Sequence, residues 1–174
     1  MKYYIIAGEA SGDLHAANMM KALKNIDSKA EFRFWGGELM ENIDGQLVKH
    51  YKDLAFMGFF EVVMNIRTIS RNLKFCKADI KKFKPNCLIF IDYPGFNLRI
   101  AKWAKSQNIK VYYYISPKVW AWKENRVHKI IKYVDYLFTI FPFETEFFKK
   151  YNYSVEYVGN PLIDAINNFK NNQN

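Results

Sequence analysis

The sequence predicts an α/β fold built on a doubly wound, parallel β-sheet. Short apolar runs alternate with segments of helical periodicity along all 174 residues, and this alternation is typical of parallel strands joined by crossover helices. Some runs, such as Lys2–Ala7 (KYYIIA) and Cys87–Ile91 (CLIFI), are apolar at almost every position. Such runs indicate strands that are covered on both faces.

The first half of the chain is expected to hold three strands and two helices. The long helix is the clearest, because Val62, Ile66, Ile69, Leu73, Cys76, Ile80 and Phe83 follow one another at spacings of four and three, and Pro85 ends the pattern. The elements expected before it are a strand at Lys2–Ala7, a turn at 8–12, a helix at Asp13–Lys24, a strand at Phe32–Trp35 that ends at Gly36 and Gly37, and a short strand near Gln46–Tyr51.

The second half continues the alternation from the apolar CLIFI strand to a closing helix. A basic amphipathic pattern predicts one of its helices at Lys123–Tyr133. The elements around it are a helix at Asn97–Gln107, strands at Val111–Ile115 (VYYYI), Tyr136–Phe141 and Val155–Val158, a helix at Glu144–Lys150, and a last helix after Gly159, Asn160 and Pro161. We expect one domain over residues 1–166, and an asparagine-rich tail or truncated linker over 167–174.

The composition favours an anionic partner in a reducing compartment. The 26 basic and 17 acidic residues give a net charge of +9, which suits a nucleic acid, a phosphorylated small molecule or an acidic membrane surface. No apolar run is long enough to span a bilayer, and the N-terminus does not resemble a signal peptide. Cys76 and Cys87 are too few for a disulfide framework, and no histidine has a partner at ligand spacing, so neither a metal nor a cofactor is expected.

Ligands of doubly wound sheets bind beyond the carboxyl ends of the strands, and the first such segment is the turn at 8–12. Its glycines and Ser11 leave backbone N–H groups open to an anion or a sugar hydroxyl, which makes Ser11, Gly12 and Asp13 candidate binding residues. The alternative is that Ser11 or Asp13 caps the helix that follows.

Asp92 follows the CLIFI strand directly. A carboxylate at the end of a parallel strand is well placed to act as a general base. The alternative is structural, with Asp92 bonded to loop amides and Asn97 capping the next helix.

The segment after the VYYYI strand combines tryptophans with cations. Trp120 and Trp122 could stack on a sugar, with Lys118, Lys123 and Arg126 near a phosphate. The alternative places both tryptophans in the core and the cations on a solvated face.

Six segments together resemble the N-terminal half of the bacterial lipid-A-disaccharide synthase family. They occur in the family's order and span nearly the whole chain: GEASGD at 8–13, MGFFEV at 57–62, IDYPGFN at 91–97, SPKVWAW at 116–122, FPFE at 141–144 and VGNPLID at 158–164. The pair SPKVWAW and IDYPGFN is the most specific part of the resemblance.

The resemblance implies a glycosyltransferase of the GT-B type, whose two halves are Rossmann-like domains. Members join diacylglucosamine from its UDP derivative to diacylglucosamine 1-phosphate through a β-1,6 link and release UDP without a metal. It implies that Asp92 is the catalytic base, and it places further residues around the same cleft: Ser11, Asp13, Glu61, Asn97, Ser116 and Trp122.

This chain departs from the family in two respects. Gly95 stands where members often carry a second aspartate, and the second Rossmann half, which supplies most of the UDP-binding surface, is missing. The chain is therefore expected to be an acceptor-side domain that is inactive alone. The competing hypotheses are another GT-B transferase or UDP-sugar epimerase domain, and a basic nucleic-acid-binding domain; the scattered cations and the lack of an RNA- or DNA-binding signature disfavour the last, so nucleic acid is not an expected partner.

A membrane contact is expected at the start of the long helix. Phe60, Val63 and Met64 extend its apolar patch around the helix, and Arg67 and Arg71 flank that patch, as in an interfacial helix on an anionic leaflet. The acyl chains of the substrates that the resemblance implies give a reason for this contact. The protein is therefore expected in the cytoplasm, peripheral on the cytoplasmic face of the inner membrane. The alternative is a fully buried helix.

Overall fold

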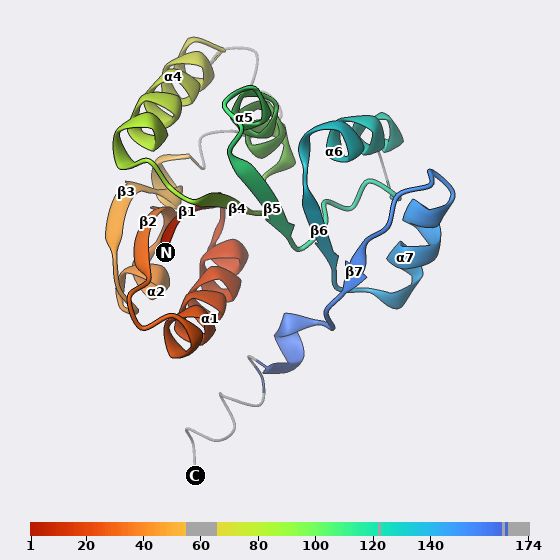
Figure 1. Ribbon diagram of the computed structural model, residues 1–174, viewed down its shortest axis with the longest axis horizontal. Helices are drawn as coiled ribbons and strands as arrows, with labels where there is room; N and C mark the ends of the chain where they lie inside the picture. The colour runs from red at the N-terminus through yellow and green to blue at the C-terminus, as the bar shows by residue number, and fades with distance from the viewer. Residues whose placement is uncertain (55–65, 122, 165, 167–174) are drawn as a thin grey trace.

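The computed structural model describes residues 1–54, 66–121, 123–164 and 166. In this part of the chain, seven parallel strands form one sheet in the order β3-β2-β1-β4-β5-β6-β7 (Figure 1). The predicted α/β class with a parallel, doubly wound sheet is confirmed. The strands are β1 (Lys2–Ala7), β2 (Glu31–Gly36), β3 (Gln46–His50), β4 (Cys87–Ile91), β5 (Lys110–Tyr114), β6 (Tyr136–Thr139) and β7 (Glu156–Tyr157).

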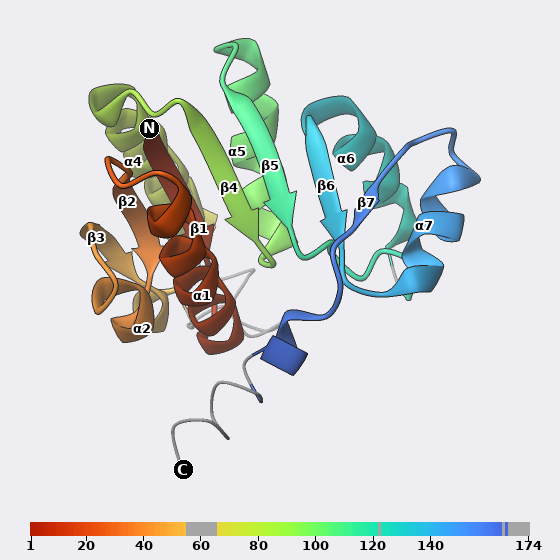
Figure 2. The ribbon, with the colours of Figure 1, turned by 60° about the horizontal axis from the view of Figure 1, so that its bottom comes forward.

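Helices cover the sheet from both sides (Figures 1 and 2). One side carries α1 (Ala10–Ile26) and α2 (Glu38–Glu41). The other carries α4 (Ile66–Phe83), α5 (Pro94–Ser106) and α6 (Val127–Tyr133), and α7 (Pro142–Lys149) adds Phe148 to the core on that same side. The described elements also include two short 3₁₀ turns, η1 (Tyr51–Asp53) and η2 (Glu124–Arg126), and residues 161–164 are helical, where the closing helix was expected.

The central strands are buried on both faces, as their apolar runs predict. In β1, Tyr4 and Ile6 join the core under α4, α5 and α6, whereas Ile5 and Ala7 join the core under α1. All four side chains are 0% exposed. Successive side chains of a strand point to opposite faces, so an unbroken apolar run supplies both cores.

The sheet reverses its strand order between β1 and β4. The chain runs outward from β1 through β2 to β3 and then returns to β4, on the other side of β1. β1 and β4 pair in parallel with Ala7 opposite Ile91. The loops that follow these two strands leave in opposite directions, and this is the position where doubly wound sheets bind ligands.

Several element boundaries differ from those expected. The structure adds α2, whose four residues are too few for a periodic pattern. α5 begins at Pro94 rather than Asn97, because proline suits the first position of a helix. Two calls, the helical stretch before residue 66 and the tail at 167–174, lie outside the described residues.

Candidate active site

The loops after β1 and β4 bring two carboxylic acids together at the reversal point. Glu9 lies two residues beyond the end of β1, and Asp92 directly follows β4. The two side chains are hydrogen-bonded to each other, and the charge of Lys118, from the loop after β5, acts on the same carboxyl group of Asp92. Side chains from the loops after β1 and β5 therefore both influence Asp92.

The backbone at Asp92 has an uncommon conformation. Asp92 has a φ of 50° and Tyr93 a φ of 49°, values that side-chain-bearing residues seldom adopt and that cluster at functional sites. The carbonyl oxygen of Asp92 accepts a hydrogen bond from Asn97 Nδ2 at 2.8 Å and another from the Tyr113 hydroxyl group. These two bonds hold the loop in place.

Gly8 allows the loop after β4 to pack against the loop after β1. A Cβ atom at Gly8 would lie 2.4 Å from Cγ of Tyr93, so the Tyr93 ring occupies the space that any larger residue would need. Glycine is thus required for the close approach of the two loops.

The environment of Asp92 favours its protonated form. Burial is the largest cause, the hydrogen bond and charge of Glu9 add to it, and together they raise the pKa of Asp92 to about 7, against the opposing positive charge of Lys118. A carboxylate with such a pKa is a stronger proton acceptor than an ordinary aspartate and is still partly ionised near neutral pH. Asp92 can therefore accept a proton from a bound hydroxyl group.

Asn97 is a wholly buried part of this loop rather than a helix cap. It lies inside the first turn of α5, whose N-cap, Tyr93, makes no side-chain hydrogen bond. Its Nδ2 also donates to the carbonyl oxygen of Ile6 at 3.4 Å, and its side chain is 0% exposed. The alternative that Asn97 caps α5 is wrong, because the helix begins three residues earlier than expected.

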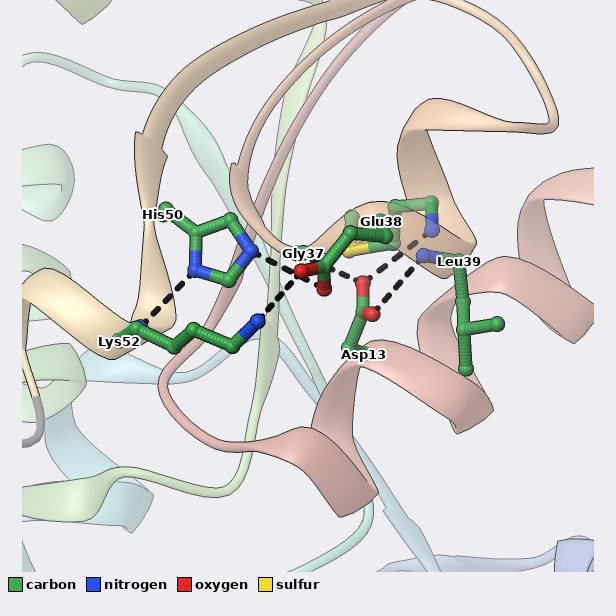
Figure 3. Close-up of polar contacts among 7 residues, drawn as sticks. Asp13, Gly37, Glu38, Leu39, His50 and Lys52 are labelled. Atoms are coloured by element: carbon green, nitrogen blue, oxygen red, sulfur yellow. Dashed lines mark hydrogen bonds and ion pairs between the residues drawn. The ribbon is translucent and has the colours of Figure 1, made fainter.

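Asp13 holds the turn after β2 instead of capping its own helix (Figure 3). Its carboxylate accepts hydrogen bonds from the backbone N–H groups of Gly37 (2.7 Å), Leu39 (3.0 Å) and Met40 (3.2 Å). The N-cap of α1 is Glu9, which makes no side-chain cap bond. Asp13 thereby joins the loops after β1 and β2, and the alternative that it or Ser11 caps α1 is wrong.

Ser11 and Gly12 differ in their exposure. Ser11 is exposed and its hydroxyl group donates to Glu9 Oε1 at 3.2 Å. Gly12 is buried, and a Cβ atom there would lie 3.2 Å from Cβ of Ala7. Of the three candidate binding residues Ser11, Gly12 and Asp13, only Ser11 has a side chain that is accessible to a ligand.

Beside Asp13, a small ionic cluster joins α2 to the end of β3 (Figure 3). Glu38 pairs with Lys52 Nζ at 2.5 Å and with His50 Nε2 at 3.1 Å. The hydrogen bond from Lys52 is the main reason that the pKa of Glu38 falls to about 2. This cluster reinforces the same turn that Asp13 holds.

Glu144 holds the loop after β6 and also interacts with the loop after β5, and the sequence had given it no role of its own. Its buried carboxylate accepts hydrogen bonds from the N–H groups of Ile140 and Phe141, both at 3.1 Å. Burial raises the pKa of Glu144, against hydrogen bonds from the side chains of Trp120 and Ser116. Its place within the FPFE segment was the feature of the sequence from which a role for Glu144 could have been predicted.

Trp120 lies outside the core but packs against another aromatic ring. Its side chain is partly exposed and meets the ring of Phe143 edge-on, with centroids 4.9 Å apart. Ser116 is buried, and its N–H group donates to the carbonyl oxygen of Phe138 at 3.0 Å. The alternative that Trp120 is a core residue is therefore wrong, whereas Ser116 is a buried residue whose side chain interacts with Glu144.

The remaining expected site residues lie on other elements than the loops around Asp92, or outside the described residues. Arg126 ends η2 and lines a groove between α5 and α6. Arg67 and Arg71 are exposed on α4. The candidates outside the described residues are Phe60, Glu61, Val63, Met64 and Trp122.

Neither a metal cage nor a spanning helix is found where the structure describes the chain. Its histidines, cysteines and carboxylates do not form a group of three that could hold an ion. The described helices are also too short or too polar to cross a bilayer.

Comparison with known sequences gives one consistent family. The family model described as lipid-A-disaccharide synthetase matches residues 3–174. The lipid-A-disaccharide synthase of Coxiella burnetii (strain Dugway 5J108-111) is 40% identical over 161 residues, which are 92% of this chain and 43% of that protein. The synthase of Geobacter metallireducens is 41% identical over 162 residues, 93% of this chain and 42% of its own. The chain thus spans less than half the length of these curated relatives.

Solved structures with the same fold include sugar-nucleotide epimerases. The UDP-GlcNAc 2-epimerase from Neisseria meningitidis superposes with a TM-score of 0.65 at 15% identity, covering 95% of this chain and 47% of that one. A putative UDP-N-acetylglucosamine 2-epimerase from Listeria monocytogenes gives a TM-score of 0.70 at 14% identity, with coverages of 96% and 47%. At such identities the likeness shows the fold alone.

Proposed function

Since this chain belongs to the lipid-A-disaccharide synthetase family, we propose that it is the acceptor-side domain of a glycosyltransferase. The proposed reaction joins diacylglucosamine, delivered as its UDP derivative, to diacylglucosamine 1-phosphate through a β-1,6 link. The observation that carries the proposal is Asp92, a partly buried carboxyl group at the reversal point of the sheet with a pKa raised to about 7. A group of this kind is what the attacking hydroxyl group needs as a general base.

In the proposed mechanism, Asp92 removes the proton from the 6-hydroxyl group of the acceptor. The hydroxyl oxygen forms a bond to the anomeric carbon of the donor, while the bond from that carbon to the UDP oxygen breaks and UDP leaves with the electron pair. Glu9 keeps the pKa of Asp92 high enough for the transfer, and Lys118 limits that rise. The hydrogen bonds from Asn97 and Tyr113 fix the direction in which Asp92 meets the acceptor.

The proposal is tested with a chimera that replaces the 161 matched residues of the Coxiella burnetii synthase with this chain. We expect the chimera to form the disaccharide and the Asp92→Asn chimera to form almost none. The 174-residue chain alone should bind diacylglucosamine 1-phosphate in mixed micelles without turnover, because two-domain transferases assemble their site between the halves. A chain that binds no acceptor would contradict the proposal.

A second part of the proposal concerns the membrane. Arg67, Arg71 and Lys74 are exposed on α4, and their spacing of four and three places them on one helix face. Phe75, adjacent to this face, is 48% exposed. A cationic face beside exposed apolar surface suits the anionic, cytoplasmic face of the inner membrane, where each cation contributes about 1 kcal/mol.

Vesicle co-sedimentation tests this surface. Replacing Arg67, Arg71 and Lys74 by serine should release the chain from phosphatidylglycerol vesicles at low salt. The matched control replaces Lys21, Lys82 and Lys150, which are exposed elsewhere, and should stay bound. Equal release of both variants would contradict a specific surface on α4.

A further inference from the structure

A groove between α5 and α6 carries a concentration of positive charge. The two helices pack beside each other on one side of the sheet (Figure 1), and the space between them measures about 360 Å³. Four cations line it, Arg99 and Lys102 from α5, and Arg126 and Lys129 from η2 and α6, with Gly95 and Tyr133 completing its polar rim. None of the lining residues is acidic.

Three of these cations, Arg99, Lys102 and Lys129, are not neutralised by ion pairs within the described residues. Within the described residues, Arg99, Lys102 and Lys129 have no carboxylate within 4.0 Å. Arg99 and Lys102 are three residues apart on α5 and therefore lie on one helix face, and Lys129 lines the same groove from α6. Such an arrangement is unfavourable until an anion enters.

The groove begins beside the loop that presents Asp92. Pro94 and Gly95 line it and come two and three residues after Asp92. Burial raises the pKa of Tyr93 to about 12 against the positive charge of Arg99, and the charge of Arg126 acts on Tyr113, whose hydroxyl group holds the carbonyl oxygen of Asp92. The cations are therefore within electrostatic range of the site.

The entrance of the groove is also open. A Cβ atom at Gly95 would have no neighbouring atom within 4 Å, and Gly95 itself is exposed. The open space of the groove, its positive charge and its position beside the Asp92 loop together indicate a ligand that places a phosphate group in the groove and another of its groups at Asp92.

We infer that this groove binds the phosphomonoester of the acceptor, an inference that rests on the proposed function. In a hexosamine 1-phosphate, the carbon that bears the phosphate and the carbon that bears the 6-hydroxymethyl group both flank the ring oxygen, so the phosphate lies within one sugar's length of the 6-hydroxyl group. A sugar whose 6-hydroxyl group meets Asp92 would then direct its phosphate toward Arg99, Lys102, Arg126 and Lys129. Arginine and lysine bind phosphate through charge-assisted hydrogen bonds.

The test measures the binding of glucosamine 1-phosphate, glucosamine and inorganic phosphate to the 174-residue chain by titration calorimetry. We expect the Lys102→Glu, Lys129→Glu double variant to bind glucosamine 1-phosphate at least tenfold more weakly. The matched control, Lys21→Glu, Lys82→Glu, makes the same charge change on exposed positions of α1 and α4 and should bind like the unmodified chain. Equal binding by both double variants would overturn the inference.

Two further arms separate the sources of phosphate. Inorganic phosphate that binds as tightly as glucosamine 1-phosphate would show that the assignment to the acceptor is wrong. So would groove variants that no longer bind phosphatidylglycerol vesicles but still bind glucosamine 1-phosphate. If chimeras that carry the groove substitutions make the disaccharide with an unchanged KM for the acceptor, the phosphate assignment to the groove is wrong, but the proposed function stands. If the unsubstituted chimera makes no disaccharide and the 174-residue chain binds no sugar phosphate, the proposed function itself is wrong.

Discussion

Asp13 and Asp92 lie at the same edge of one sheet, but their surroundings give them opposite properties. Asp13 is 2% exposed and its carboxylate meets three backbone N–H groups. Asp92 meets the carboxyl group of Glu9 and the charge of Lys118. A buried carboxylate that accepts three backbone hydrogen bonds holds together the loops around it. One that faces another acid is ready to exchange a proton.

The largest expected effect comes from Asp92→Asn in the chimera. Loss of a general base lowers kcat on the order of 100- to 10,000-fold, and we expect a fall of that size in disaccharide synthesis. Near-normal turnover would make Asp92 a loop-bonding residue, like Asp13.

The same variant should not lose stability. The pKa of Asp92 in the folded chain, about 7, lies above the ordinary 3.8, so the stability that comes with the protonated form declines as the pH rises from about 4 through about 7. Above pH 7, the neutral amide of asparagine avoids the unfavourable burial of a charge. Thermal unfolding at pH 8 should therefore give a Tm equal to or higher than that of the unmodified chain.

Asp13→Ala should do the reverse and act mainly on stability. It leaves the N–H groups of Gly37, Leu39 and Met40 without their acceptor, and breaking such a buried charged network costs about 2–4 kcal/mol of unfolding free energy. Urea denaturation measures the loss. Glu38→Gln, which weakens only the exposed ionic cluster next to it, should cost about 1 kcal/mol or less.

The contrast between the two aspartates also marks the limit of what the sequence could predict. The strands were predicted within a few residues, because Cys87–Ile91 and its neighbours are apolar runs that report their own burial. The position of Asp92 followed from its strand. The partners of Asp13 could not be predicted in this way, because they lie 24 to 27 residues away in a turn fixed only by the fold.

Glu9 was missed for the same reason. In the sequence it is an acid in a surface turn, and nothing local connects it to Asp92. The connection arises because β1 and β4 are neighbours in the sheet, with Ala7 opposite Ile91. Strand order, which the sequence does not state, therefore decides which two acids meet.

Glu9→Gln in the chimera should shift the pH dependence of activity. Glu9 raises the pKa of Asp92 through its hydrogen bond and its charge, so a neutral glutamine lowers that pKa, and the acidic limb of the kcat/KM profile moves to lower pH. The shift should be smaller than the full distance to an ordinary aspartate, because burial, the largest cause, remains. Ser11→Ala, which removes only the hydrogen bond to Glu9, is the control and should leave the limb close to its original position.

The smallest expected effect is a shift in the opposite direction from Lys118→Met. The positive charge of Lys118 favours the ionised form of Asp92, and its removal should raise the pKa of Asp92 further and move the acidic limb of kcat/KM to higher pH. Because Lys118 is exposed, solvent screens its charge, and the shift should be smaller than that of Glu9→Gln and shrink with added salt. Lys123→Met, from the same loop, is the matched control. Shifts of the same sign in Glu9→Gln and Lys118→Met would show that the limb does not report Asp92, since the two charges act on this carboxyl group with opposite sign.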